Sequence, residues 1–468
     1  MSTNGLTHTR KIPFRFDLLD LHCSNPERYP ALIESVASDT RLGRYDILFA
    51  FPDEVLRLDA CGDLTGPRLD PLTGPVTDRR TGFLPAFDRW WQQLRQPVSP
   101  VRQLPFTGGW FMLLGYELAN EIEPGLRLRT DPRQPVAVAL RVPVAVIRDR
   151  DTESAWIVAE AGCEARLADV VADLDGLRTG SASAGSHPVA GLSEENPARF
   201  LAAVTAAKVH IAAGDIYQAN LSRQWHGALR PGASAADIYR RLRMRNPAPF
   251  AGLVVLPGLA VISSSPERLL WTDGKRVETR PIAGTRARLP GGPGEQAMRR
   301  ELHDHPKERA EHVMLIDLER NDLGRICRPG SVRVDEFMVI ESYAHVHHIV
   351  SNVCGELRDD ATPGTIIHSL FPGGSITGCP KVRCMQIIHE LENRPRGVYT
   401  GAMGYFNRDG SGDLNILIRT MTVTDGELTI ATGSGIVADS SPQQELEETR
   451  AKARGMLLAL EAGPGSAS

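Results

Sequence analysis

The chain has 468 residues, which is long for one ordinary core, because domains commonly hold about 100–200 residues. Its 53 Lys and Arg residues nearly balance 57 Asp and Glu residues, and a formal net charge of −4 gives no electrostatic reason to expect binding to nucleic acid or to an anionic membrane. The N-terminal segment MSTNGLTHTRKIPFRF lacks the apolar core of a secretion signal, and no run reaches the roughly 18 apolar residues of a membrane helix, so we expect a cytoplasmic protein.

Residues 1–185 are predicted to form a sheet-rich N-terminal domain. Apolar runs such as YDILFAF and AVALRVPVAVIRD have the alternation and length of strands, and turn residues separate them. This part contains no catalytic motif of its own. The segment RTGSASAGSHPVAGLSEENP (178–197) is rich in Gly, Ser, Ala and Pro and has no hydrophobic period, which indicates a linker and places the domain boundary there.

Residues 190–462 are predicted to form the second domain. A helix should begin at Pro197 and stop at Gly214, because apolar residues recur at helical spacing between them. Six strand-like segments follow, and further helices are expected to begin at Pro306, Pro380 and Pro442. Many strands with separate helices favour an α+β fold of large mixed or antiparallel β-sheets with helices packed outside, rather than regular βαβ alternation. The last residues, 463–468, should form a disordered tail.

Two of these helices carry acidic residues suited to a metal ion. The helix from Pro306 has Glu308, Glu311, Glu319 and Asp322, and the helix from Pro442 has Glu445, Glu448 and Lys452 at i, i+3 and i+7 on one face. Acidic residues on one helix are usually a solvated face, and Glu448 with Lys452 also suits a simple surface ion pair. Two carboxylate-bearing helices that meet in a cleft would instead suit a hard, oxygen-seeking ion such as Mg²⁺.

Two glycine-rich turns suit an anionic ligand. FPGGSITGCPK (371–381) leads into a helix whose N-terminal amides attract an anion, and TGSGIV (432–437) is a second such turn. Neither matches the GxxxxGK[ST] or GxGxxG nucleotide motif. HVHH (345–348) places its histidines on opposite faces of an extended segment, and the seven cysteines are scattered without CxxC spacing, so a zinc site and a disulfide framework are both disfavoured.

Five segments, in this order along the chain, resemble the chorismate-binding enzyme family. They are SPERLL (265–270), RPIAGTRAR (280–288), HPKERAEHVMLIDLERNDLGR (305–325), FPGGSITGCPKVRCMQII (371–388) and TGSGIVADSSPQQELEETRAKA (432–453). The resemblance covers essentially all of residues 195–460. A weaker likeness in the N-terminal part rests on PALIESVA (30–37), YDILFAFP (45–52) and GGWFMLLGYEL (108–118). The resemblance implies the fold of this family and an enzyme that acts on chorismate.

The members of the family differ in what attacks chorismate. Those that add water carry a lysine base where this chain has Gln218, and an amide cannot act as that base, so the resemblance favours amination. GSITG (374–378) and Ala251 resemble the aminodeoxychorismate synthase branch, whose 4-amino product leads to 4-aminobenzoate and folate. Ala283 replaces the lysine nucleophile of many members of that branch, and together with LIES (32–35) it resembles the anthranilate synthase branch instead. A non-catalytic homologue that binds tryptophan or chorismate is a third alternative.

The resemblance also implies site residues. Glu311 and Glu448 match magnesium ligands, with Glu445 close enough to act through water, and the ion would hold the ring carboxylate of chorismate. Glu267 is the first candidate for the general acid/base that serves the leaving C4 hydroxyl, and His348 is the second. Positions that match the substrate-holding groups are Gly284, Thr285, Tyr399, Arg419, Gly433, Ser434, Gly435, Lys452 and Gln218. Lys381 is expected to add positive charge near them.

Ammonia is expected to come from a partner protein, because no cysteine lies in the sequence context of a glutaminase nucleophile. We therefore expect a heterodimer with a separate glutamine amidotransferase subunit, for which free ammonia can substitute in vitro. The N-terminal domain is expected to offer a tryptophan-like pocket and contacts to that partner.

Overall fold

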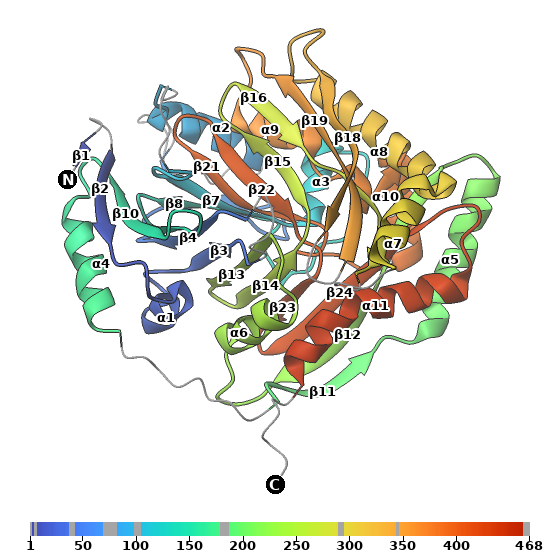
Figure 1. The fold of residues 1–468 in the computed structure, drawn as a ribbon, viewed down its shortest axis with the longest axis horizontal. Helices are drawn as coiled ribbons and strands as arrows, with labels where there is room; N and C mark the ends of the chain where they lie inside the picture. The colour runs from blue at the N-terminus through green and yellow to red at the C-terminus, as the bar shows by residue number, and fades with distance from the viewer. Residues whose placement is uncertain are drawn as a thin grey trace.

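The structure is a computed structural model that describes residues 2–3, 7–36, 43–68, 82–97, 104–177, 187–288, 294–342 and 346–461. Two large antiparallel β-sheets pack against each other through a shared apolar layer, and helices cover their outer faces (Figure 1). This arrangement confirms the predicted α+β fold with large antiparallel sheets and helices packed outside.

The first sheet contains 13 strands of the described chain. Their order across the sheet is β1 (Ser2–Thr3), β2 (Thr7–Ile12), β10 (Ser154–Glu160), β9 (Val144–Asp149), β4 (Tyr45–Ala50), β3 (Ala31–Glu34), β13 (Phe250–Leu256), β14 (Leu259–Ser265), β23 (Thr420–Thr424), β24 (Glu427–Ile436), β12 (Gln218–Leu229) and β11 (Val189–Glu194). The short β20 (Gly378–Cys379) pairs with the start of β12.

The second sheet contains 11 described strands. Their order is β17 (Ile282–Ala287), β19 (Val346–Glu356), β16 (Arg276–Thr279), β15 (Arg268–Thr272), β22 (Gly412–Ile416), β21 (Ala402–Asn407), β7 (Gly109–Leu114), β8 (Ala137–Val142), β5 (Val55–Leu58) and β6 (Leu64–Thr65), with β18 (Arg333–Ser342) paired to β19.

Strands from both sides of the predicted domain boundary lie side by side in each sheet. Leu32 of β3 pairs with Leu253 of β13, and Leu113 of β7 pairs with Met403 of β21. The apolar layer between the sheets likewise draws on both parts of the chain. Pairing satisfies strand edges that would otherwise stay open, so the two parts share their sheets and a core instead of forming separate ones.

Part of the predicted linker is a strand. β11 pairs with β12, and only its first residue, Val189, is buried while the others are half-buried or exposed. An edge strand with one buried apolar side chain has no hydrophobic period that its sequence could reveal. Residues 178–186 of the predicted linker and the predicted tail 463–468 lie outside the described residues.

Helices cover both outer faces. Against the first sheet lie α1 (Leu18–Ser24), α4 (Ala165–Asp175), α6 (Ala235–Arg245) and α11 (Pro442–Leu460). Against the second lie α2 (Phe83–Leu94), η1 (Tyr116–Leu118), α3 (Ala119–Ile122), α8 (Pro306–Gly324), α9 (Pro363–Leu370), η2 (Gly374–Ile376) and α10 (Lys381–Glu392). The remaining two are α5 (Pro197–Ala212), which joins α10 and α11 beside β12, and α7 (Glu295–Asp304), beside β18 and β19.

Proline explains where the long helices start. The helices predicted at Pro197, Pro306 and Pro442 begin at those residues, since the fixed φ and missing N–H of proline suit a first turn. The helix expected at Pro380 begins one residue later, with Pro380 as its cap. None of the described helices combines the length and the apolar character that a membrane span requires.

Candidate active site

Six of the predicted site residues line one cavity of about 140 Å³. They are Glu267, His348, Tyr399, Arg419, Gly433 and Lys452. Elements of both sheets form this cavity: β12 and β24 contribute from the first, β17 and β19 contribute from the second, and α11 and η2 complete the lining. The fold thus brings together lining side chains that are as far apart in the sequence as Asn220 and Lys452.

Two cationic side chains face this cavity. Arg419 forms no ion pair with a carboxylate in the described part of the chain, and burial lowers the pKa of its guanidinium, although arginine stays charged at neutral pH. Lys452 donates to the carbonyl oxygen of Gly433 at 3.0 Å and forms an ion pair with Glu448 at 2.7 Å. A shielded guanidinium without a carboxylate partner favours an anionic ligand, and its planar fork suits a carboxylate.

The carboxyl of Glu267 is the acidic group of the cavity. Glu267 lies in the turn between β14 and β15, is 5% exposed, and accepts a hydrogen bond from Ser375 Oγ at 2.8 Å. Burial raises the pKa of Glu267 to about 7; the Ser375 hydrogen bond opposes that rise, and the nearby Glu319 carboxylate adds to it. A carboxyl with such a pKa can hold a proton at neutral pH and give it to a leaving group.

His348 and Gly284 meet on neighbouring strands. Burial lowers the pKa of His348 to about 4, with Arg419 adding to the effect, so the imidazole is neutral at pH 7 and is a poorer proton donor than Glu267. The His348 ring is hydrogen-bonded to the backbone of Gly284, where β17 has a bulge and φ is +66°. Ala283 precedes this bulge. Thr285 pairs with His348 through the backbone, but its side chain lies outside the described part.

The glycines of β24 serve close packing. A Cβ at Gly433 would lie 2.5 Å from Asn220 Oδ1 and 2.8 Å from the Tyr399 hydroxyl, and a Cβ at Gly435 would lie 2.5 Å from Gln218 Nε2. Amide side chains of β12 therefore cover both glycines. Ser434, between them, turns its hydroxyl away to donate to Glu445 Oε2. Of the three, only Gly433 lines the cavity.

Gln218 lies beside the cavity and not on its lining. Its side chain is 8% exposed, and its amide oxygen has no hydrogen-bond partner among the described residues. Asn220, two residues along the same strand face, lines the cavity instead.

The structure places the three predicted metal ligands on two helices. Glu448 and Glu445 lie on α11, where Glu448 pairs with Lys452 and Glu445 is held by Ser434; Glu311 lies on α8. Within the described ranges, no group of three or more His, Cys, Asp and Glu side chains is arranged to hold a metal ion. The available donors are carboxylate oxygens, which are the ligand type that Mg²⁺ prefers, often with few protein ligands and several waters.

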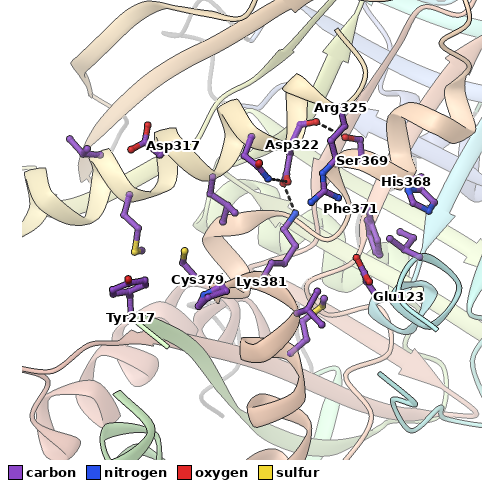
Figure 2. A pocket seen from close by; sticks show the side chains of 18 of the residues that line it. Glu123, Tyr217, Asp317, Asp322, Arg325, His368, Ser369, Phe371, Cys379 and Lys381 are labelled. Atoms are coloured by element: carbon purple, nitrogen blue, oxygen red, sulfur yellow. Dashed lines mark hydrogen bonds and ion pairs between the residues drawn. The ribbon is translucent and has the colours of Figure 1, made fainter. Parts of the chain in front are cut away.

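Lys381 belongs to a different cavity. It forms an ion pair with Asp322 at 2.5 Å on the wall of a cavity of about 750 Å³ between α8 and α10, as Figure 2 shows. Most of the lining of this larger cavity is apolar, and Tyr217, Val313 and Val382 on its rim are among the exposed large hydrophobic side chains. The expected role of Lys381 at the substrate thus has no support from its position.

A further cavity, of about 410 Å³, lies between the two sheets. Its lining includes Ile33 and Ser35 of the LIES segment and Pro249 and Phe250, which precede Ala251, together with the Arg268–Asp413 ion pair. Both sides of the predicted domain boundary contribute to this cavity, whereas the tryptophan-like pocket was expected in the N-terminal domain alone.

Three polar residues near the site, Asn220, Ser375 and Glu319, were not among the predicted site residues. Asn220 could have been found from the two-residue period that starts at Gln218. Ser375 lies in a glycine-rich turn whose side-chain directions a sequence does not reveal. Glu319 was one of several acidic residues on the helix from Pro306, and its burial, at 5% exposure, depends on what the helix packs against.

Known proteins match this chain over most of its length. The sequence profile of chorismate binding enzymes matches residues 67–458. The chain is 42% identical over 393 residues to aminodeoxychorismate synthase component 1 of Bacillus subtilis, covering 81% of this chain and 82% of that protein. It is also 42% identical over 365 residues to an anthranilate synthase component I-like protein of Synechocystis sp., covering 76% and 74%.

A solved structure, anthranilate synthase component I from Streptococcus pneumoniae, superimposes with a TM-score of 0.77 at 28% identity over 89% of this chain and 93% of that one. This likeness confirms the fold type that the motifs implied. The two kinds of synthase occur at similar identity, so the comparisons leave the product open. The profile match over most of the chain shows that this protein belongs to the chorismate binding enzyme family and uses chorismate.

Proposed function

We propose that this protein catalyses the Mg²⁺-dependent amination of chorismate to 4-amino-4-deoxychorismate, which supplies 4-aminobenzoate and folate synthesis. The observation that carries the proposal is the cavity in which Arg419 and Lys452 lie with the buried carboxyl of Glu267. A substrate with two carboxylates and a hydroxyl group to be displaced needs cations to hold it and an acid to protonate the leaving oxygen.

Four of the lining groups have a chemical task in this reaction. Arg419 would hold one substrate carboxylate through its planar fork, and Lys452 would add positive charge. Glu267 would give its proton to the C4 oxygen as the C–O bond breaks, so that water leaves. The ammonia nitrogen that forms the new C–N bond then loses one proton, which balances the proton spent. Neutral His348 can hydrogen-bond to the substrate without adding charge.

The choice of reaction rests on Gln218 and on the glycine-rich turn. The amide of Gln218 cannot deprotonate water, which favours ammonia as the nucleophile. The GSITG turn, and the relative in Bacillus subtilis that is named an aminodeoxychorismate synthase, favour the 4-amino product. Anthranilate synthesis is the second candidate, because Ala283 provides no lysine nucleophile and the Synechocystis relative is named for that reaction.

Glu311 and Glu448 are the proposed magnesium ligands, with Glu445 acting through water. Glu448 pairs with Lys452, and its charge acts on Arg419, so this carboxylate lies next to the cavity. When bound, Mg²⁺ would act as a Lewis acid and as a template for the ring carboxylate of chorismate.

A separate glutamine amidotransferase subunit is the proposed source of ammonia, in a cytoplasmic heterodimer. The support is the sequence itself, in which no cysteine has the context of a glutaminase nucleophile.

Product analysis tests the proposal. Purified protein is incubated with chorismate, Mg²⁺ and ammonium, with and without aminodeoxychorismate lyase. 4-Aminobenzoate that forms only with the lyase supports the proposal, and fluorescent anthranilate without the lyase establishes the second candidate.

Removal of the metal tests the magnesium site. Activity should be lost with EDTA and return with Mg²⁺, and Glu311→Gln and Glu448→Gln should raise the Mg²⁺ concentration needed for half-maximal activity. Unchanged turnover in EDTA would refute the metal assignment.

A further inference from the structure

Two buried carboxyls lie on either side of one short turn. Ser375 Oγ donates to Glu267 Oε1 at 2.8 Å, and the backbone N–H of its neighbour Gly374 donates to the carboxylate of Glu319. Both glutamates are 5% exposed. Glu319 Oε1 lies 3.2 Å from the point where a Cβ on Gly374 would be, so α8 packs closely against this turn.

Neither carboxyl has a cationic partner in the described part of the chain. Lys381 lowers the pKa of Glu319 by its charge, but its ammonium group forms an ion pair with Asp322 instead. The Thr279 side chain provides the other hydrogen bond to Glu319. Burial raises the pKa of Glu319 to about 7, and Asp322 adds to the rise. The charge of Glu319 in turn disfavours ionisation of Glu267.

We infer that Glu319 is a positioning residue for the acid step of this enzyme: its buried carboxyl, held against the Gly374–Ser375 turn that also holds Glu267, opposes ionisation of both carboxyls together, so that Glu267 keeps to higher pH the proton with which it acts. The inference rests on the proposed function of Glu267 as the acid. It gives a role to a carboxyl that lines none of the three cavities described above.

Two acids that share one buried site oppose each other's ionisation. When two carboxyls lie close together in a region of low polarity, ionisation of one raises the free energy of ionising the other. If Glu319 carries the charge, Glu267 retains its proton to higher pH. With Glu319 replaced by a neutral side chain, Glu267 loses its proton at a lower pH than in the wild type. Above that pH, Glu267 can no longer protonate the leaving group.

Other charged groups that face this pair set the size of the effect. Around Glu267 these are Lys452 of α11, and Arg419 and His348 across the cavity. Around Glu319 they are Asp322 of the same helix and Lys381 of α10. Lys452 opposes protonation of Glu267, whereas burial and the Glu319 carboxylate favour it.

The test is the pH dependence of turnover in Glu319→Gln, measured at a constant concentration of free NH₃ and at saturating chorismate. Glutamine keeps the size of the side chain and an oxygen acceptor for the Gly374 N–H. We expect the limb on which kcat falls with rising pH to move to lower pH by about 1 unit, while the KM for chorismate changes little. A limb that stays where the wild type has it overturns the inference.

Two variants separate charge from packing. Glu319→Asp keeps the charge and should keep the limb near its wild-type position; an equal shift in Glu319→Asp would mean that shape matters and would overturn the inference. Asp317→Asn removes a carboxylate from the exposed side of the same helix, where Asp317 is 66% exposed, and should leave the limb unchanged. An equal shift there would show a nonspecific effect and would also overturn it.

An infrared titration gives a readout that needs no turnover. The protonated-carboxyl band that disappears in Glu267→Gln is followed against pH in wild-type protein and in Glu319→Gln. A lower midpoint in Glu319→Gln supports the inference even if the wild type fails to aminate chorismate, a result that would reject the proposed function alone. Equal midpoints reject the inference even if amination is confirmed.

Discussion

The carboxylate of Glu117 accepts the backbone N–H of Arg396 at 2.7 Å, and it also accepts the N–H of Gly397 at 3.1 Å. Glu117 lies on η1, in the part of the chain that was predicted to be a separate domain, whereas Arg396 begins the turn that carries Tyr399 to the cavity. The Arg396 guanidinium also donates to the carbonyl oxygen of Asn220 at 2.6 Å. The position of Tyr399 therefore depends on an N-terminal residue.

Replacement of Glu117 by glutamine should weaken this connection. Glutamine retains one acceptor oxygen but turns an NH₂ group toward backbone donors, which leaves a buried donor unpaired and should lower the free energy of unfolding by about 1–3 kcal/mol. Urea unfolding measures the change, and chorismate binding should weaken with it. The exposed Glu153→Gln serves as the control, and a Glu117→Gln protein as stable as this control would contradict the structural role.

Stability should also depend on pH through Glu117. Burial raises the pKa of Glu117 from 4.5 to about 7. The folded-state pKa of Glu117 lies above its unfolded-state pKa. The contribution of Glu117 to the free energy of unfolding is therefore fully present below pH 4.5 and is lost as the pH rises through 7. Urea unfolding between pH 5 and 8 should therefore show a smaller loss of stability in Glu117→Gln than in the wild type. Equal slopes would show that Glu117 has an ordinary pKa.

Glu267→Gln should remove the proton donor and leave the substrate site intact. We expect kcat to fall by about 10²–10⁴-fold, whereas the Kd for chorismate, measured by calorimetry, should stay within a few-fold of the wild-type value. Glu427→Gln, a carboxylate that is 68% exposed on β24, is the matched control. Loss of binding in parallel with loss of turnover would assign Glu267 to the structure of the cavity instead of to proton transfer.

Arg419→Ala should weaken chorismate binding because it removes the guanidinium fork. A hydrogen bond to a charged group contributes about 1.5–3 kcal/mol, so Kd should rise by about 10–150-fold. Arg419→Lys should give an intermediate loss, since it keeps the charge without the fork. Arg450→Ala, at an exposed ion pair of α11, should bind chorismate normally. Unchanged binding in Arg419→Ala would place the substrate carboxylates elsewhere.

Gly433→Ala should be poorly tolerated. The new methyl group would lie 2.5 Å from Asn220 Oδ1 and 2.8 Å from the backbone oxygen of Leu221, and overpacking of this kind costs about 1–3 kcal/mol. Thermal unfolding should show the loss, and chorismate binding should weaken because Tyr399 is also displaced. Gly324→Ala, with nothing within 4 Å at the end of α8, is the control and should be neutral or mildly stabilising. Equal Tm values for the two variants would refute close packing at Gly433.

Local sequence signals predicted the helices well. Proline at the first turn and apolar residues at helical spacing placed the starts of α5, α8 and α11 at the observed residues. Compositional signals failed at β11, because part of the glycine- and serine-rich segment predicted as a linker pairs with β12. An edge strand is held by backbone hydrogen bonds to a distant partner, and its own side chains carry little of that information.

By itself, the sequence determined the family, the α+β class, and the residue types needed for chemistry on an anionic substrate, because motifs of fixed spacing and the period of apolar residues are local properties. Only the tertiary structure decided which of those residues share a cavity. Glu267, Arg419 and Lys452 line one cavity, whereas Lys381 lines another. The side-chain amide of Gln218 packs against Gly435 and does not line either cavity. It also buried Glu319 beside Glu267, and burial is what converts an ordinary acidic residue into one whose charge acts on its neighbour.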